Sequence, residues 1–193
     1  QLRVREAVED LNTMVRGDKD KDVQRAALTA MAKIPDNGQD KVFLLYLRDK
    51  DDKLRAAAAE GLGRSGNPSD VKTLQEAFAI EKDESVRLSL AFGAVSLGDT
   101  NMLSYLVDGL DSKFHRLEAR PFLTELARDP QVLPELYTPL TSGTEQQKIE
   151  LAYVISRSGT RESEPYLERL TKDTNPKVAA AALSELNNLR ARL

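Results

Sequence analysis

Cysteine and tryptophan are absent from this sequence of 193 residues, and histidine occurs once. Without cysteine the chain cannot form a disulfide, a thiolate zinc site, an iron–sulfur cluster or a cysteine nucleophile. One histidine, His115, also excludes a metal site built from several histidines. The side chains that most catalytic and metal centres require are therefore scarce, and no catalytic residue, metal or cofactor is expected.

A strong excess of one charge and long apolar runs are missing as well. The chain carries 28 Lys+Arg against 31 Asp+Glu, and its formal net charge of -3 gives no net attraction to nucleic acid or to anionic lipid. No run approaches the roughly 18 to 20 apolar residues that a membrane span needs. With 40% hydrophobic residues the chain is too apolar to be disordered. These features predict a soluble, folded protein and disfavour a nucleic-acid partner.

What the chain does contain is a repeated pattern. Six similar hexapeptides recur along it, and we call the first residue of each an anchor. The anchors are Val23, Leu54, Val86, Phe114, Gln147 and Val178. Successive anchors are 28 to 33 residues apart, with a mean of 31, and chance similarity would not hold this phase for so long. A fixed period of this length indicates a repeat architecture.

A second landmark lies twelve residues after each of the first five anchors. It is Pro35, Gly66, Gly98 or Gly159, and only the fourth copy differs, with Leu126. Glycine closes a helix at its C-terminal end and proline cannot continue one, so a helix is expected to run from each anchor to its landmark. Capping side chains for the start of a second helix follow in residues 67–70, 99–101 and 162–165.

The apolar spacing supports pairs of helices. In the second helices apolar residues recur every three or four positions, as at Leu103, Leu106 and Leu110. The first helices are rich in alanine, as in residues 56–59 and 179–182, and small side chains allow close packing. One such pair cannot bury enough surface to offset its loss of conformational entropy, so it must stack on the next pair. The sequence predicts an all-α protein, an α-solenoid of helix pairs.

Three segments of the second unit carry a family resemblance. Residues 52–59, 63–68 and 71–74 read Asp-Lys-Leu-Arg-Ala-Ala-Ala-Ala, Gly-Arg-Ser-Gly-Asn-Pro and Val-Lys-Thr-Leu. This pattern resembles the short HEAT repeat of about 30 residues, the type also found in phycobilin lyases. The resemblance covers nearly the whole chain and is weakest in the fourth copy. It implies a right-handed α-α superhelix in which first helices line the convex side and second helices line the concave, partner-binding side.

The repeat phase divides the chain into approximate units of a single HEAT-like repeat domain, residues 1–193. The units are a partial N-terminal unit 1–17, the repeats 18–49, 50–81, 82–111, 112–141 and 142–173, and a C-terminal capping helix 174–193. Because the chain begins with Gln1 and not with Met, we expect either that a preceding segment was removed or that this is a piece of a longer protein.

The fourth copy is irregular. Pro121 interrupts its first helix, and Pro130, Pro134 and Pro139 crowd its second. Because proline removes a helix hydrogen bond and clashes with the preceding turn, this unit is predicted to be bent or short. The sequence leaves open whether the irregularity shapes a partner groove.

The charged residues of the turns have structural interpretations. His115 occupies the place that Arg55 and Lys148 hold in other copies, where HEAT repeats commonly use a basic residue to tie neighbouring units. Two turns, residues 18–22 and 49–53, alternate or cluster Asp with Lys. Both lack the central glycine and closing glutamate of a calcium loop, so these carboxylates are predicted to be helix caps.

The tyrosines suggest a binding surface. Tyr46, Tyr105, Tyr137 and Tyr166 fall in second helices, and Tyr105 and Tyr166 each lie seven residues past a landmark glycine. Tyrosine presents a large amphipathic surface with few torsions to order, which suits partner binding. Packing inside the repeats is the alternative interpretation. The hypothesis of a concave binding surface names Tyr105, Tyr166, Lys72, Ser104 and Arg169.

Three classes of function fit these features. The first is a noncatalytic protein-interaction scaffold or adaptor that binds a protein or peptide partner on the concave face. The second is a phycobilin-lyase-like enzyme or accessory subunit. The third is a nucleic-acid-binding HEAT-like module, which the acidic balance disfavours. The scaffold is favoured because repeats occupy the chain and leave no separate catalytic insert, while the partner, the compartment and the oligomeric state stay undefined.

Overall fold

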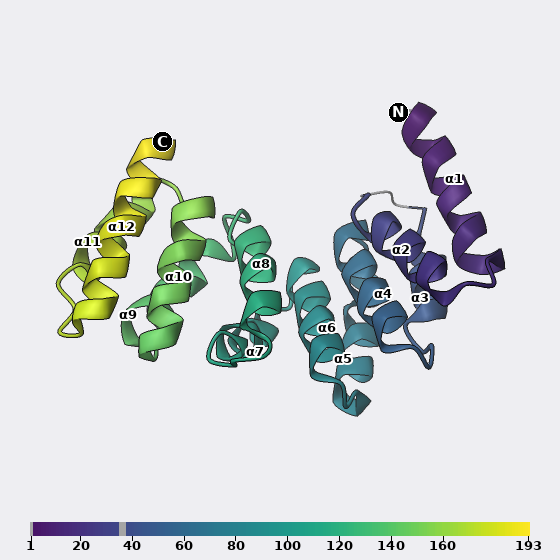
Figure 1. Cartoon of the computed structure of the whole chain (residues 1–193), viewed down its shortest axis with the longest axis horizontal. Coiled ribbons are helices and arrows are strands. Elements are labelled where there is room, and N and C mark those ends of the chain that lie inside the picture. Colours follow the sequence, from purple (N-terminus) through teal and green to yellow (C-terminus); the bar gives the residue numbers. More distant parts are fainter. Residues whose placement is uncertain (1, 35–37) are drawn as a thin grey trace. The chain divides into compact units, whose positions relative to one another are not determined.

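The computed structural model describes residues 2–34 and 38–193 (Figure 1). Over these residues the chain forms twelve α-helices and four short 3-10 helices and no strand, which confirms the predicted all-α fold. The first landmark, Pro35, lies outside the described residues. Within the same ranges no helix is both long enough and apolar enough to cross a bilayer.

The chain divides into two compact units, Gln1–Leu103 and Ser104–Leu193, and each is described by itself. In unit 1 the first helices α2, α4 and α6 pack in sequence, α1 packs on α2, α3 packs on α4, and α5 packs on α6 (Figure 1). Its elements are α1 (Leu2–Gly17), α2 (Lys21–Ala32), α3 (Asp40–Tyr46), α4 (Asp52–Ser65), η1 (Pro68–Asp70), α5 (Val71–Ile80), α6 (Glu84–Ser96) and η2 (Thr100–Met102).

Unit 2 repeats this arrangement. The first helices α8, α10 and α12 pack in sequence, α9 packs on α10, α11 packs on α12, and α9 contacts α11. Its elements are α7 (Leu103–Gly109), which begins at the last residue of unit 1, α8 (Arg116–Leu126), η3 (Leu133–Leu136), α9 (Tyr137–Ser142), α10 (Glu145–Ser158), η4 (Arg161–Ser163), α11 (Glu164–Leu170) and α12 (Pro176–Arg192). The helix pairs that the 31-residue period predicted are therefore present in both units.

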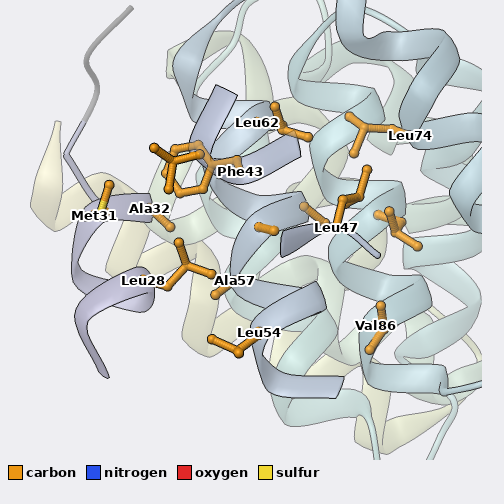
Figure 2. Close-up of a cluster of buried hydrophobic side chains, with 14 of the residues drawn as sticks. Leu28, Met31, Ala32, Phe43, Leu47, Leu54, Ala57, Leu62, Leu74 and Val86 are labelled. Carbon is orange, nitrogen blue, oxygen red and sulfur yellow. The ribbon is translucent and has the colours of Figure 1, made fainter. Parts of the chain in front are cut away.

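The core of unit 1 lies between its first and second helices (Figure 2). Phe43 of α3 is 1% exposed and its ring lies directly against Gly61 of α4, where an added Cβ atom would come within 2.2 Å of the ring. Leu54 and Leu62 of α4 and Leu74 of α5 are fully buried in the same cluster. The missing side chain at Gly61 thus makes the space that the phenylalanine fills.

Two more glycines let α4 and α6 approach each other closely. A Cβ atom at Gly93 would lie 2.6 Å from the carbonyl oxygen of Ala59, and one at Gly63 would lie 2.6 Å from the Cα atom of Gly93. Both obstacles are backbone atoms, which cannot turn aside as the end of a flexible side chain can. Small residues at this contact therefore set the distance between neighbouring repeats, as the alanine-rich first helices predicted.

We expect Gly93→Ala to lower the free energy of unfolding by about 1 to 3 kcal/mol, because α4 and α6 must separate to admit the methyl group. Gly17→Ala is the matched control, since nothing lies within 4 Å of a Cβ atom at Gly17. Alanine there should be neutral or stabilise the helix by up to about 1 kcal/mol. Urea unfolding measures both changes. Equal stability of the two variants would show that the contact between α4 and α6 tolerates a larger residue.

The glycines that end first helices do so in two ways. Gly66 and Gly98 have φ values of 79° and 102°, the left-handed backbone that glycine adopts without strain, as predicted. Gly159 instead has an extended backbone, with φ -67° and ψ 171°, and its N–H donates to the carbonyl of Ile155 at 2.7 Å. This third helix end is closed without a left-handed residue.

The fourth copy is less disrupted than predicted. Its first helix, α8, continues through Pro121 to Leu126, so the proline does not interrupt it, and η3 precedes α9 just as η2 precedes α7 and η4 precedes α11. The anchor in this copy, however, was assigned one residue early: Phe114 is 86% exposed, whereas Leu54 and Val86 are buried at the same place in their repeats. The fourth and eighth residues after the anchor are buried in every other first helix; counted from His115 they are the buried Ala119 and Leu123, whereas counted from Phe114 they are the exposed Glu118 and the half-buried Phe122.

This shift also corrects the role given to His115. Arg116, and not His115, stands where Arg55 stands in its repeat, and it lies 3.7 Å from Glu150 of α10. The Nδ1 atom of His115 lies 3.5 Å from Glu118 Oε2 in the first turn of its own helix. The tie between neighbouring units at this place is therefore formed by an arginine.

Candidate partner-binding site

The acidic residues of the turns are used to start first helices. In four turns a carboxylate accepts a hydrogen bond from the backbone N–H two residues later, at 2.8 to 2.9 Å, and that later residue caps the next helix. The four carboxylates belong to Asp18, Asp49, Glu81 and Asp173. No group of three acidic or histidine residues suited to a metal occurs among the described residues. Of the carboxylates predicted to cap helices in residues 18–22 and 49–53, Asp20 caps α2 and Asp51 caps α4, while Asp18 and Asp49 each accept from the N–H of the cap residue.

Basic residues of one repeat reach the turn of the next. Arg55 Nε lies 2.7 Å from Glu81 Oε2, and Lys148 Nζ lies 2.9 Å from Asp173 Oδ2. Arg25 of α2 likewise bonds the carboxylate of Asp51, which caps α4. The ties predicted at Arg55 and Lys148 are therefore present, and Arg25 forms a further tie that the sequence did not predict.

The pKa values of the turn carboxyls reflect these contacts. Hydrogen bonds from Arg25 lower the pKa of Asp51, and the hydrogen bond from the lysine of α10 lowers that of Asp173. For Glu81 burial acts to raise the pKa, but the hydrogen bonds from Arg55 and from two backbone amides outweigh it, so the pKa is lowered. All three groups therefore favour the charged form in the folded protein.

We expect the folded protein to lose stability as the pH falls below about 5. A carboxyl whose folded pKa lies below its ordinary value, 3.8 for Asp or 4.5 for Glu, contributes stability above that value and loses it as the pH falls through the lowered one. Thermal unfolding followed by circular dichroism at pH 7 and pH 3 measures the effect. The decrease in Tm from pH 7 to pH 3 should be smaller for Lys148→Met than for the unchanged protein. An equal Tm at both pH values for the unchanged protein would contradict the prediction.

Two residues of the predicted binding surface meet in a groove of unit 2. Tyr166 and Arg169 of α11 face α9 across an open groove of about 540 Å³. Its lining residues are Pro134, Tyr137, Thr138, Thr141, Glu162, Tyr166 and Arg169. We call it the tyrosine groove. It lies between consecutive second helices, the elements that the sequence assigned to the binding side.

Stacked rings form the centre of the tyrosine groove. The rings of Tyr137 and Tyr166 have centroids 3.8 Å apart and an interplanar angle of 10°. The hydroxyl of Tyr137 lies 2.9 Å from the hydroxyl of Ser163, which is fully buried and also accepts from the N–H of Thr160 at 3.1 Å. The pKa of Tyr137 is raised, chiefly by burial. The hydrogen bond to Ser163 acts to lower this pKa, and the nearby Tyr166 acts to raise it. Both rings are half-buried, so their positions are fixed while part of each meets solvent.

The other predicted site residues lie elsewhere. Tyr105 of α7 is half-buried and Ser104 is exposed, and neither lines the tyrosine groove. Lys72 is exposed on α5 of unit 1, with its Nζ atom 3.9 Å from Glu76 Oε1. Tyr46 donates its hydroxyl to the carbonyl of Val15 at 2.9 Å, which is a packing role.

Tyr137 is the aromatic member of the groove that the sequence did not select. The loop before it is longer than in other copies, which concealed its register. Its position 29 residues before Tyr166, close to one repeat, was the available signal.

The family description HEAT repeats matches residues 40–138, slightly more than half of the chain. The chain belongs to the HEAT-repeat family. No curated protein matches this HEAT-repeat chain.

Solved structures similar to the HEAT-repeat chain are distant. Human deoxyhypusine hydroxylase in complex with glycerol is 12% identical, with a TM-score of 0.45, covering 95% of this chain and 84% of the other. An engineered protein is 18% identical, with a TM-score of 0.43 and coverage of 94% and 97%. A computationally designed armadillo repeat protein for modular peptide recognition is 18% identical, with a TM-score of 0.38 and coverage of 92% and 99%. Similarities at this level carry no inference about function.

Proposed function

We propose that this HEAT-repeat chain is a noncatalytic interaction scaffold or adaptor that binds a protein or peptide partner on its second helices, with the tyrosine groove as one contact. The observation that carries the proposal is the stacked pair of Tyr137 and Tyr166, held at 3.8 Å and half-exposed beside Arg169. Ordered aromatic side chains and arginine are the residue types that contribute most to binding energy in protein interfaces.

The chemistry of the groove supports binding. Its lining offers two aromatic rings, two threonine hydroxyls, and one charge of each sign on Arg169 and Glu162. The hydroxyl of Thr141 donates to the backbone carbonyls of Tyr137 and Thr138 in its own helix. The same residues can present hydrogen bonds and an apolar surface to a peptide.

Partner capture by groove variants tests this function. Tyr166→Ser and Arg169→Glu, each shown to be folded by circular dichroism, should capture a partner at least about ten-fold less well than the unchanged protein. Arg161→Glu is the matched control, because Arg161 is exposed in η4 and does not line the groove. Undiminished capture by both folded groove variants would refute the role of this groove. A spectral change on adding a bilin, or salt-dependent DNA binding, would favour one of the other two function classes.

We also propose that residues 1–193 form one HEAT-repeat domain. The support is the 31-residue phase, which continues in the sequence through the division between Leu103 and Ser104. A single cooperative transition, coincident for probes placed in each unit, is expected in urea, and two separate transitions would contradict it.

A further inference from the structure

A second groove, in unit 1, has a different chemistry from the tyrosine groove. It has a volume of about 810 Å³ and lies between the residues that follow α3 and the C-terminal part of α5, beside the start of α4. Its largely apolar surface comes from Leu47 after α3 and from the end of α5. The α5 residues that line it without charge are Thr73, Ala77, Ala79 and Ile80. We call it the isoleucine groove.

Ile80 is anomalous when the repeats are compared with one another. It directly precedes Glu81, one of the four turn carboxylates that start first helices. The residues that precede the other three carboxylates are Gly17, Arg48 and Lys172, so Ile80 is the one large apolar residue at this repeat position. It is 79% exposed. An aliphatic side chain of this size gains free energy when a partner removes it from water.

The charges around the isoleucine groove are unbalanced. Two acidic residues of the lining already have basic neighbours: Glu81 is paired with Arg55 at 2.7 Å, and Glu76 lies 3.9 Å from Lys72. The remaining charged residues of the lining are Arg48 and Lys82, which are both exposed and form no ion pair among the described residues. The open charge at the rim is therefore positive, although the chain as a whole has a net charge of -3.

We propose that the isoleucine groove is a docking site for a partner segment that places one or two aliphatic side chains between acidic residues. The aliphatic side chains would lie against Ile80, Ala77 and Leu47, where the alanine leaves room for them. The acidic residues would pair with Arg48 and Lys82 at the rim. This docking site is independent of the tyrosine groove, which belongs to the other unit.

Two synthetic peptides test the proposal. One has two leucines between pairs of glutamates, and the other has lysines in place of the glutamates. In a titration followed by amide NMR of the whole chain, the glutamate peptide should shift the signals of Ala77, Ala79 and Ile80. The lysine peptide should bind at least about ten-fold more weakly, because it repels the rim.

Variants of the groove, each paired with a control, distinguish peptide binding in the groove from nonspecific attraction to the chain. Ile80→Ser and Lys82→Glu should each lower the affinity of the chain for the glutamate peptide about ten-fold. The matched controls are Leu183→Ser, at an exposed aliphatic residue outside the groove, and Lys172→Glu, at the repeat position of Ile80, and neither should change the affinity.

Three results would overturn the proposal. The first is equal affinity for the two peptides, and the second is an equal effect of the groove variants and the controls. The third comes from sedimentation: if the unchanged chain is a dimer and Ile80→Ser is a monomer, a second copy covers the groove. Folding of each variant is checked by its circular-dichroism spectrum. A milder substitution, Ile80→Ala, should give an affinity between those of the unchanged chain and Ile80→Ser.

Discussion

Phe43→Ala is expected to lower the free energy of unfolding by about 3 to 5 kcal/mol, the cost of removing a fully buried aromatic ring. The ring fills the space above Gly61 and is 1% exposed, so its loss leaves a cavity that α4 cannot close with a side chain. Leu45→Ala is the matched control on the same helix, because Leu45 is 62% exposed. It should change stability by no more than about 0.5 kcal/mol.

A double variant tests whether the stability lost in Phe43→Ala comes from the contact between Phe43 and Gly61 or from a general destabilisation of α3. Gly61→Ala alone should destabilise, because its Cβ atom would meet the ring of Phe43 at 2.2 Å. With Phe43→Ala present the same methyl group enters the empty space, so the two costs should not add. Urea unfolding of the four proteins gives the coupling. Strict additivity would show that the two residues do not share this contact.

Leu106→Ala is expected to cost about 2 to 5 kcal/mol, since Leu106 is fully buried and belongs to the apolar stripe of α7. Lys50→Ala, in an exposed turn, should cost about 0.5 kcal/mol or less. Leu183→Ala controls for the change in residue type, because Leu183 is 54% exposed on α12. Equal losses for Leu106→Ala and Leu183→Ala in urea would mean that α7 does not hold its side chain in a core.

The sequence predicted the helix pairs because their determinants are local. Gly66 and Gly98 end helices through their own backbone freedom. The anchor of the fourth copy was misplaced because hexapeptide similarity records residue type and not burial. Phe114 and Leu117 are both apolar, yet they are 86% and 70% exposed.

The candidate site was only partly predictable for a similar reason. Tyr166 and Arg169 could be assigned to a second helix by their distance from Gly159. The partner ring of Tyr137 depends on where η3 and α9 begin in the fourth copy, which the spacing of prolines does not determine. Ile80 gave no signal as a single residue, since one exposed aliphatic side chain is common on protein surfaces.

The contacts between a basic residue and the following turn have a consequence for how the chain unfolds. Asp51 starts α4 by accepting from the N–H of Leu54, and the same carboxylate is held by Arg25 of α2. A helix whose first turn is oriented by the preceding helix becomes easier to open once that neighbour has opened. Fraying of unit 1 should therefore begin at its N-terminal end, and amide hydrogen exchange should be slower in α4, which packs between the first helices α2 and α6, than in α2.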